Sequence, residues 1–117
     1  MSKISFEGIG EVAATFVCGE GVEAGEVVKV TANGTVGACA AGEKFGGVAL
    51  TVDGGYGTVQ LEGLVKVKLA ASHGVSVGWN HLLADGSGGV KKDSASAPTG
   101  REHLVISVDS DGAVVRL

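Results

Sequence analysis

An alternation of apolar and polar side chains between residues 59 and 69 constrains the fold of this chain more than any other feature. Odd positions in this stretch hold apolar residues or glycine, and Leu64 is the one apolar residue at an even position. The polar even positions are Gln60, Glu62, Lys66 and Lys68. A period of two predicts β-strand, with the odd positions on one face of a sheet and the polar side chains on the other. Gly63 interrupts the apolar face and predicts a bend, either within one long strand or at a corner between two strands.

Shorter alternating runs predict further strands, and turn signals separate them. The runs cover residues 12–16, 28–31, 48–52, 104–109 and 113–117. Asn33-Gly34, Asp53-Gly54-Gly55 and Asp111-Gly112 predict tight hairpin turns, because these residue types accept the positive φ angles of such turns. Residues 85–100 contain the only proline and predict a turn, a short strand around Val90 and an exposed loop. Residues 69–76 could form a single helical turn, so the chain is predicted to be all-β with little helix.

Two pairs of segments resemble each other and indicate an internal repeat. Residues 48–61 are similar to residues 104–117, and residues 21–25 are similar to residues 74–78. Repeats of this length are typical of duplicated supersecondary units, and chance matching among abundant valines and glycines is the alternative explanation. The expected architecture is a small closed barrel or sandwich of about 8–10 short strands joined by hairpins. If the repeat is real, two duplicated halves would pack around one core.

Length and charge narrow the classes of function. A chain of 117 residues predicts a single β domain over 11–117, preceded by a flexible N-terminal arm over 1–10. The net charge is −4 and no basic stripe is present, which argues against a nucleic-acid partner. The sequence has neither the apolar run of a membrane helix nor the pattern of a signal peptide, so we expect no membrane partner.

Glycine-rich motifs are present, but each lacks the context that its chemistry requires. Residues 8–13 match a loose dinucleotide-binding pattern without the strand and helix that should flank it. Residues 54–57 lack the Lys-Ser/Thr of a phosphate-binding loop, and residues 109–112 lack the further oxygen ligands of a calcium loop. These segments are predicted to be turns.

The remaining reactive side chains form no motif either. His73, His81 and His103 have no metal-ligand spacing, although a site assembled in space stays an alternative. Cys18 and Cys39 are interpreted as small buried apolar residues, with a disulfide as the alternative. We therefore predict that the protein is not an enzyme, and that it has no catalytic residues, cofactor or metal site.

Several short motifs follow one another along residues 21–117. They are Ala24-Gly25-Glu26, Ala41-Gly42-Glu43, Gly47–Leu50, Val59–Val67, Val77–Trp79, Asp85-Gly86 and Val115–Leu117. Their order and spacing resemble the capsid cement, or head decoration, proteins of tailed phages and prophages.

The resemblance implies a structural protein that binds the outer surface of an assembled phage head and stabilises it. The implied partners are the major capsid protein and further copies of the chain in a trimer. The implied location is the virion surface, after assembly in the bacterial host cytoplasm.

Four residues are candidates for capsid or subunit contacts. Ile4, Phe6 and Ile9 are the apolar residues of the N-terminal arm, which could order on the shell or against a neighbouring copy; a disordered or self-packed terminus is the alternative. Trp79 could anchor a partner interface, or it could lie half-buried with its N–H on a carbonyl, which is the more common situation for tryptophan. The alternative function is a small β-barrel ligand-binding or carrier-type module without catalytic activity. The carrier form is disfavoured because the predicted hairpin tips contain no lysine.

Overall fold

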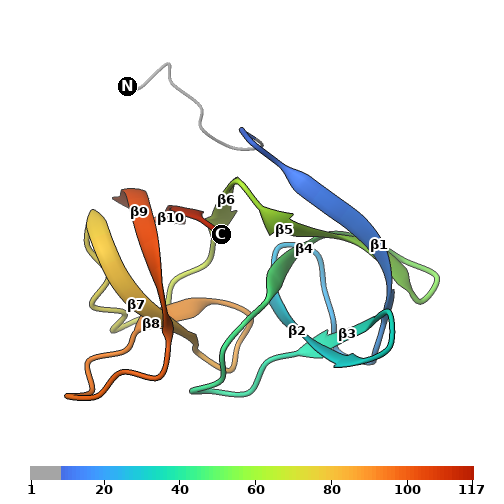
Figure 1. The fold of residues 1–117 in the computed structure, drawn as a ribbon, viewed down its shortest axis with the longest axis horizontal. Helices are drawn as coiled ribbons and strands as arrows, with labels where there is room; N and C mark the ends of the chain where they lie inside the picture. Colours follow the sequence, from blue (N-terminus) through green and yellow to red (C-terminus); the bar gives the residue numbers. More distant parts are fainter. Residues whose placement is uncertain (1–8) are drawn as a thin grey trace.

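The computed structural model describes residues 9–117, and this part of the chain forms ten β-strands and no helix (Figure 1). The all-β prediction is therefore confirmed. The strands are β1 (Val12–Cys18), β2 (Val27–Ala32), β3 (Thr35–Ala38), β4 (Gly47–Asp53), β5 (Tyr56–Glu62), β6 (Leu64–Val67), β7 (Gly78–Ala84), β8 (Val90–Lys92), β9 (Arg101–Asp109) and β10 (Gly112–Arg116).

The strands form two five-stranded units that lie side by side in Figure 1. The first unit, β1 to β5, is a closed barrel with the order β1-β5-β4-β2-β3, in which β3 returns to β1. The second unit, β6 to β10, is a sheet with the order β6-β10-β9-β7-β8. The two strand orders match when five is added to each strand number, so β6 corresponds to β1 and β10 to β5. The predicted repeat is therefore visible in the topology.

The two units also close at the same point. In the first unit Cys18 pairs with Val36 in the parallel contact between β1 and β3. In the second unit Leu69 forms an isolated parallel bridge to Val90, just after β6 and at the start of β8. The second unit is therefore a sheet with the strand order of the barrel, and a single bridge lies where the barrel closes.

The predicted turns and the predicted corner lie where the sequence placed them. Gly54 and Gly55 connect β4 to β5 with φ angles of 60° and 84°, which favour glycine. Gly63 separates β5 from β6 with a φ of 98°. A Cβ atom on Gly63 would lie 2.6 Å from the backbone of Gly10, so the corner requires glycine for its space as well as its φ.

Apolar side chains form two clusters. The smaller one fills the first barrel and includes Val28, Val36 and Val59. The larger one fills the second unit and continues into the junction, where Val27 and Val48 of the first unit join it. The repeat had suggested that two halves pack around one core. The two clusters show instead that the units do not share a single barrel interior. The outer face of the first unit packs on the interior of the second.

Gln60 corrects one sequence-based expectation. The alternation placed it on the polar face of its strand, yet it is only 1% exposed. Its Nε2 donates hydrogen bonds to the carbonyl oxygens of Glu62 and Leu64 at 3.0 and 3.2 Å. The outer face of β5 is covered by the second unit here, so the amide is satisfied by the backbone of the corner instead of by water.

Candidate interaction surface

Trp79 lies on the outer face of β7 and is 60% exposed. Its cross-strand partner is Leu104 of β9, and its indole makes no hydrogen bond to residues 9–117. The half-buried alternative is therefore wrong. Nothing in the described chain covers this face of the sheet, and a large exposed aromatic side chain on a β-sheet is a feature of partner-binding surfaces.

The surroundings of Trp79 are also apolar. His103 and Val105 of β9 point into the unit, so Leu104 and Ile106 point outward and are only partly buried. The neighbouring strand β10 alternates in the same way: Ala113 and Val115 are buried, and Val114 faces outward. We call the outward-facing set Trp79, Leu104, Ile106 and Val114 the Trp79 face. Arg116 lies at its edge and is exposed.

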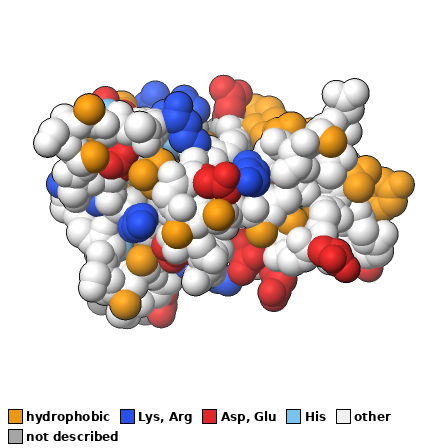
Figure 2. Space-filling view, turned by 90° about the horizontal axis from the view of Figure 1, so that it is seen from below, with side chains coloured by type: hydrophobic (Ala, Val, Ile, Leu, Met, Phe, Trp, Pro, Cys, Tyr) orange, Lys and Arg blue, Asp and Glu red, His pale blue; other side chains and the backbone are white. Residues whose placement is uncertain are grey.

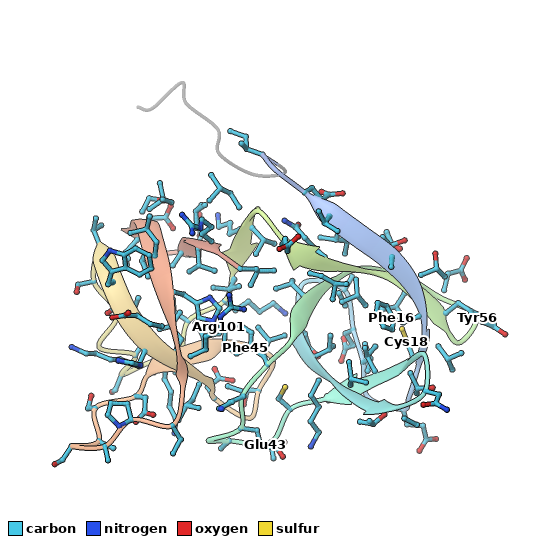
Figure 3. All side chains as sticks on the ribbon, viewed as in Figure 1. Phe16, Cys18, Glu43, Phe45, Tyr56 and Arg101 are labelled. Atoms are coloured by element: carbon cyan, nitrogen blue, oxygen red, sulfur yellow. The ribbon has the colours of Figure 1, made fainter. Side chains whose placement is uncertain are left out.

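A second exposed patch lies at the opposite end of the molecule. Val17 of β1 pairs with Tyr56 of β5, and both side chains are exposed, Tyr56 to 59%. Figure 3 places Tyr56 at the far end from β7 and β9, and Figure 2 shows hydrophobic side chains gathered at that end. Thr58 continues the strand, and Asp53 pairs with Tyr56 from β4. We call Val17, Tyr56, Thr58 and Asp53 the Tyr56 face. The sequence analysis missed it, although an aromatic residue directly after a glycine turn was a signal for it.

The N-terminal candidates are described only in part. Ile4 and Phe6 lie outside the described residues. Ile9 is 56% exposed, and its carbonyl oxygen accepts a hydrogen bond from the Leu64 amide at 2.9 Å. Ile9 also lines an open groove of about 560 Å³ together with Arg101 and Arg116. Ile9 therefore lies beside the corner between the two units.

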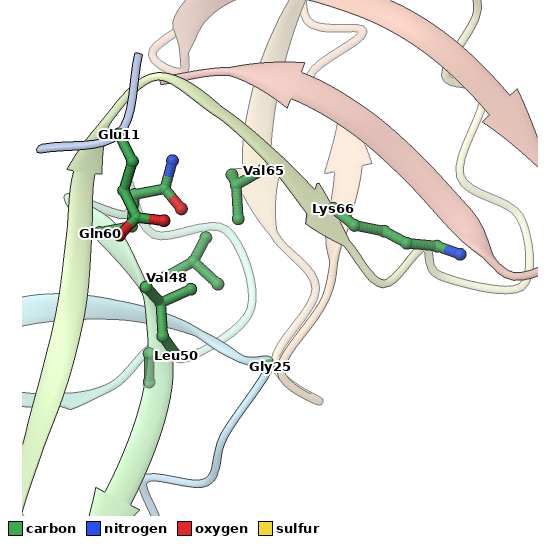
Figure 4. A pocket seen from close by; sticks show the side chains of 8 residues that line it. Glu11, Gly25, Val48, Leu50, Gln60, Val65 and Lys66 are labelled. Atoms are coloured by element: carbon green, nitrogen blue, oxygen red, sulfur yellow. The ribbon is translucent and has the colours of Figure 1, made fainter. Parts of the chain in front are cut away.

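A cavity of about 380 Å³ lies at the junction of the units. Val48 and Leu50 of β4 line it from the first unit, and Val65 of β6 lines it from the second (Figure 4). Glu11 and Lys66 add a carboxylate and an ammonium group to the lining. Its size and its mixture of apolar walls with a few polar groups are compatible with a small ligand.

The three histidines differ in their hydrogen-bond partners and burial. His73 accepts a hydrogen bond from the Val75 amide, and His81 Nδ1 lies 2.9 Å from the carbonyl oxygen of Gly100. His103 is buried, with Nδ1 donating to the Arg116 carbonyl oxygen and Nε2 without a partner among the described residues. Burial lowers the pKa of His103 below its usual 6.5, and the charge of Arg101 lowers it further. Within residues 9–117, no group of three His, Cys, Asp or Glu side chains could hold a metal ion.

The surroundings of Cys39 do not activate its thiol. Cys18 and Cys39 are both free, and Cys39 is buried as expected, whereas Cys18 is partly exposed. Burial raises the pKa of Cys39 to about 11, with a further contribution from the charge of Glu43. A thiol with so high a pKa is protonated at neutral pH and is a poor nucleophile.

The carboxylates with shifted pKa values hold loops in place. Asp93 accepts hydrogen bonds from the amides of Ala95, Thr99 and Gly100, and these lower the pKa of its carboxyl group. Glu43 is held by Lys29, whose Nζ lies 2.7 Å from Oε1, and this contact lowers the Glu43 pKa. Both pKa shifts are explained by structural contacts, and neither residue belongs to a cluster of reactive groups.

Comparison with known proteins gives no relative: no protein-family model matches the sequence, and no curated protein matches it significantly. The part of the chain that the structure describes contains no helix long and apolar enough to cross a membrane.

Proposed function

We propose that this protein is a structural head decoration protein, which binds the outer surface of a tailed-phage capsid and stabilises the shell. The proposal starts from the sequence motifs that resemble the capsid cement family. One structural observation carries it further: the chain presents a large exposed aromatic residue, Trp79, on a partly apolar sheet face. A rigid β scaffold with such a face is suited to binding other proteins.

The capsid lattice would increase the strength of such a contact. Many copies bind to one shell, and copies that also contact each other bind with higher avidity than a single chain. The expected partners are the major capsid protein and other copies of this chain, arranged as a trimer if the family resemblance holds. Ile4, Phe6 and Ile9 are the proposed contacts of the N-terminal arm, and Trp79 is the proposed contact of the β domain.

Co-sedimentation with capsids tests the proposal. Purified protein is mixed with undecorated expanded heads of the matching phage, and the pelleted protein is quantified. We expect saturable binding in a fixed ratio to the major capsid protein, and weaker binding by a variant that lacks residues 2–8. Val30→Ser is the control, because Val30 is exposed on β2 away from the arm. Absence of binding to expanded heads would reject the proposal.

The junction cavity favours a second candidate, a small ligand-binding module. Its volume of about 380 Å³ is within the range of small-molecule sites, and Glu11 and Lys66 could orient a polar ligand. Native mass spectrometry of the freshly purified protein would reveal a bound molecule as an added mass. Loss of that mass in a Val65→Trp variant, which fills the cavity, together with no binding to heads, would favour this candidate over the first.

A further inference from the structure

The repeat allows each residue of one unit to be compared with its counterpart in the other. Val48 of β4 and Leu104 of β9 occupy matching positions, because residues 48–61 align with residues 104–117. Their cross-strand partners also match: Val27 of β2 pairs with Val48, and Trp79 of β7 pairs with Leu104. The pair Val27–Val48 and the pair Trp79–Leu104 are therefore the same place on the outer face of two similar units.

These matching places have opposite environments. Val27 and Val48 are each 1% exposed, because the second unit packs on them. Trp79, in contrast, is 60% exposed, and Leu104 is only partly buried. The protein thus shows, within one chain, that this outer face can be buried by another β unit. The matching face of the second unit is left open, and there Trp79 takes the place of the smaller Val27.

Charge distinguishes the two ends of the molecule. Residues 9–62 carry seven acidic and two basic side chains, a net charge of −5, whereas residues 63–117 carry five acidic and six basic side chains, a net charge of +1. Contact between two Trp79 faces would set two units of net charge +1 against each other. Contact between a Trp79 face and a Tyr56 face would instead bring Arg116 toward the acidic unit that carries Asp53. Opposite charges across an interface favour the second arrangement.

The size of the ends is also adequate. The dimensions perpendicular to the long axis are 35 and 21 Å, so an end can present at most roughly 700 Å² to a flat partner. A stable protein–protein interface buries about 800 Å² on each partner. One end of this molecule is therefore close to the size that a specific contact requires.

We propose that the Trp79 face of one copy binds the Tyr56 face of a second copy. Such a head-to-tail contact uses two different surfaces, so it can continue from copy to copy, as a ring where the rotation between copies closes and as an open filament where it does not. The inference rests on the homo-oligomer part of the proposed function, and it does not require a capsid.

Site-specific crosslinking tests which faces meet. Glu102→Cys, on β9 beside the Trp79 face, and Thr15→Cys, on β1 beside the Tyr56 face, both leave Trp79 and Tyr56 in place. They are made separately in a chain in which Cys18 and Cys39 are replaced by alanine, and each is treated with a short bis-maleimide. We expect little crosslinking in either variant alone and strong crosslinking in their mixture. Efficient crosslinking of the Glu102→Cys variant alone would mean a symmetric contact between two Trp79 faces and would overturn the proposal. No crosslink in the mixture would overturn it as well.

The strength of association provides a second measurement on the native chain. By analytical ultracentrifugation we expect the native chain to self-associate and Trp79→Ser to raise the dissociation constant at least tenfold. Val30→Ser replaces another exposed apolar side chain and should leave the dissociation constant unchanged. A chain that stays monomeric into the millimolar range, or a Trp79→Ser variant that associates normally, contradicts the inference. The head-binding assay is scored separately. Crosslinking without head binding rejects only the capsid function, and head binding by a chain that never self-associates rejects only this contact.

Discussion

Phe45 stacks on His103 across the junction of the two units, with ring centroids 5.1 Å apart and ring planes inclined by 12°. Phe45 belongs to the loop between β3 and β4 of the first unit, and His103 belongs to β9 of the second. The loop is fixed beside the second unit by two backbone hydrogen bonds: Gly42 N donates to Ala84 O, and Ala84 N donates to Glu43 O, both at 2.9 Å. The stacked pair thus joins the interior of the second unit to the first. Figure 3 shows Phe45 between the two units.

Replacing Phe45 by alanine should destabilise the whole chain. Removal of a buried aromatic ring leaves a cavity and typically costs about 3–4 kcal/mol. We expect a loss of this size in the free energy of unfolding measured by urea denaturation. Val30→Ala is the control and should change stability by less than about 0.5 kcal/mol, because Val30 is exposed. A loss below about 1 kcal/mol for Phe45→Ala would contradict the view that this ring holds the units together.

Acid should weaken the fold through His103. Burial lowers its folded pKa below 6.5, so the unfolded chain binds the proton more readily than the folded one. Stability is then complete above pH 6.5 and declines as the pH falls toward the folded pKa, by up to about 1.4 kcal/mol per pH unit.

The matched variant for this effect is His103→Phe, which keeps a stacking ring and removes the titrating group. Urea denaturation across a pH series should show a smaller slope below pH 6.5 in this variant than in the native chain. Asp93 and Glu43 do not affect this comparison. Their pKa values are lowered from 3.8 and 4.5, so the stability that they contribute is lost at a lower pH than that of His103. Equal slopes in the two proteins would show that His103 does not control the acid response.

Gly63 should tolerate no side chain. Its φ of +98° is unfavourable for other residues, and an added Cβ would lie 2.6 Å from the carbonyl carbon and oxygen of Gly10. Gly42 is the matched control, since its φ is +83° but the space around it is open.

We expect Gly42→Ala to cost about 1–2 kcal/mol from backbone strain alone. Gly63→Ala should cost roughly 1–3 kcal/mol more, because the backbone of the corner has to move as well. Thermal and urea unfolding of both variants measure the difference. Equal losses would mean that the close approach of Gly10 contributes nothing to the corner.

Asp93 should control the order of the loop between β8 and β9. Its carboxylate accepts the amide hydrogen bonds of Ala95, Thr99 and Gly100. Asp93→Ala should therefore increase hydrogen exchange at residues 94–100, while exchange in the strands stays the same. Asp53→Ala, at an exposed hairpin end, is expected to leave this loop unchanged. Unaltered exchange at residues 94–100 in Asp93→Ala would show that the loop is ordered by other contacts.

Much of the fold could be predicted from local patterns. The alternation over residues 59–69 predicted β5 and β6 with the corner at Gly63, and the glycine turns predicted the hairpins β2–β3, β4–β5 and β9–β10. These features depend on the period of a strand and on the φ angles that glycine accepts, and both are properties of a few consecutive residues. The similarity of residues 48–61 to 104–117 likewise predicted the repeat that the strand order displays.

The sequence by itself determined that each strand has two different faces, and only the tertiary structure decided which of them meets water. Gln60 was expected on the solvent side and is buried, and Trp79 was expected to be half-buried and is exposed. Burial of each side chain depends on whether residues far away in the sequence pack on it. Such residues cover Gln60 and leave Trp79 exposed. Alternation cannot report such contacts, because burial of an outer sheet face depends on how the second unit packs against the first.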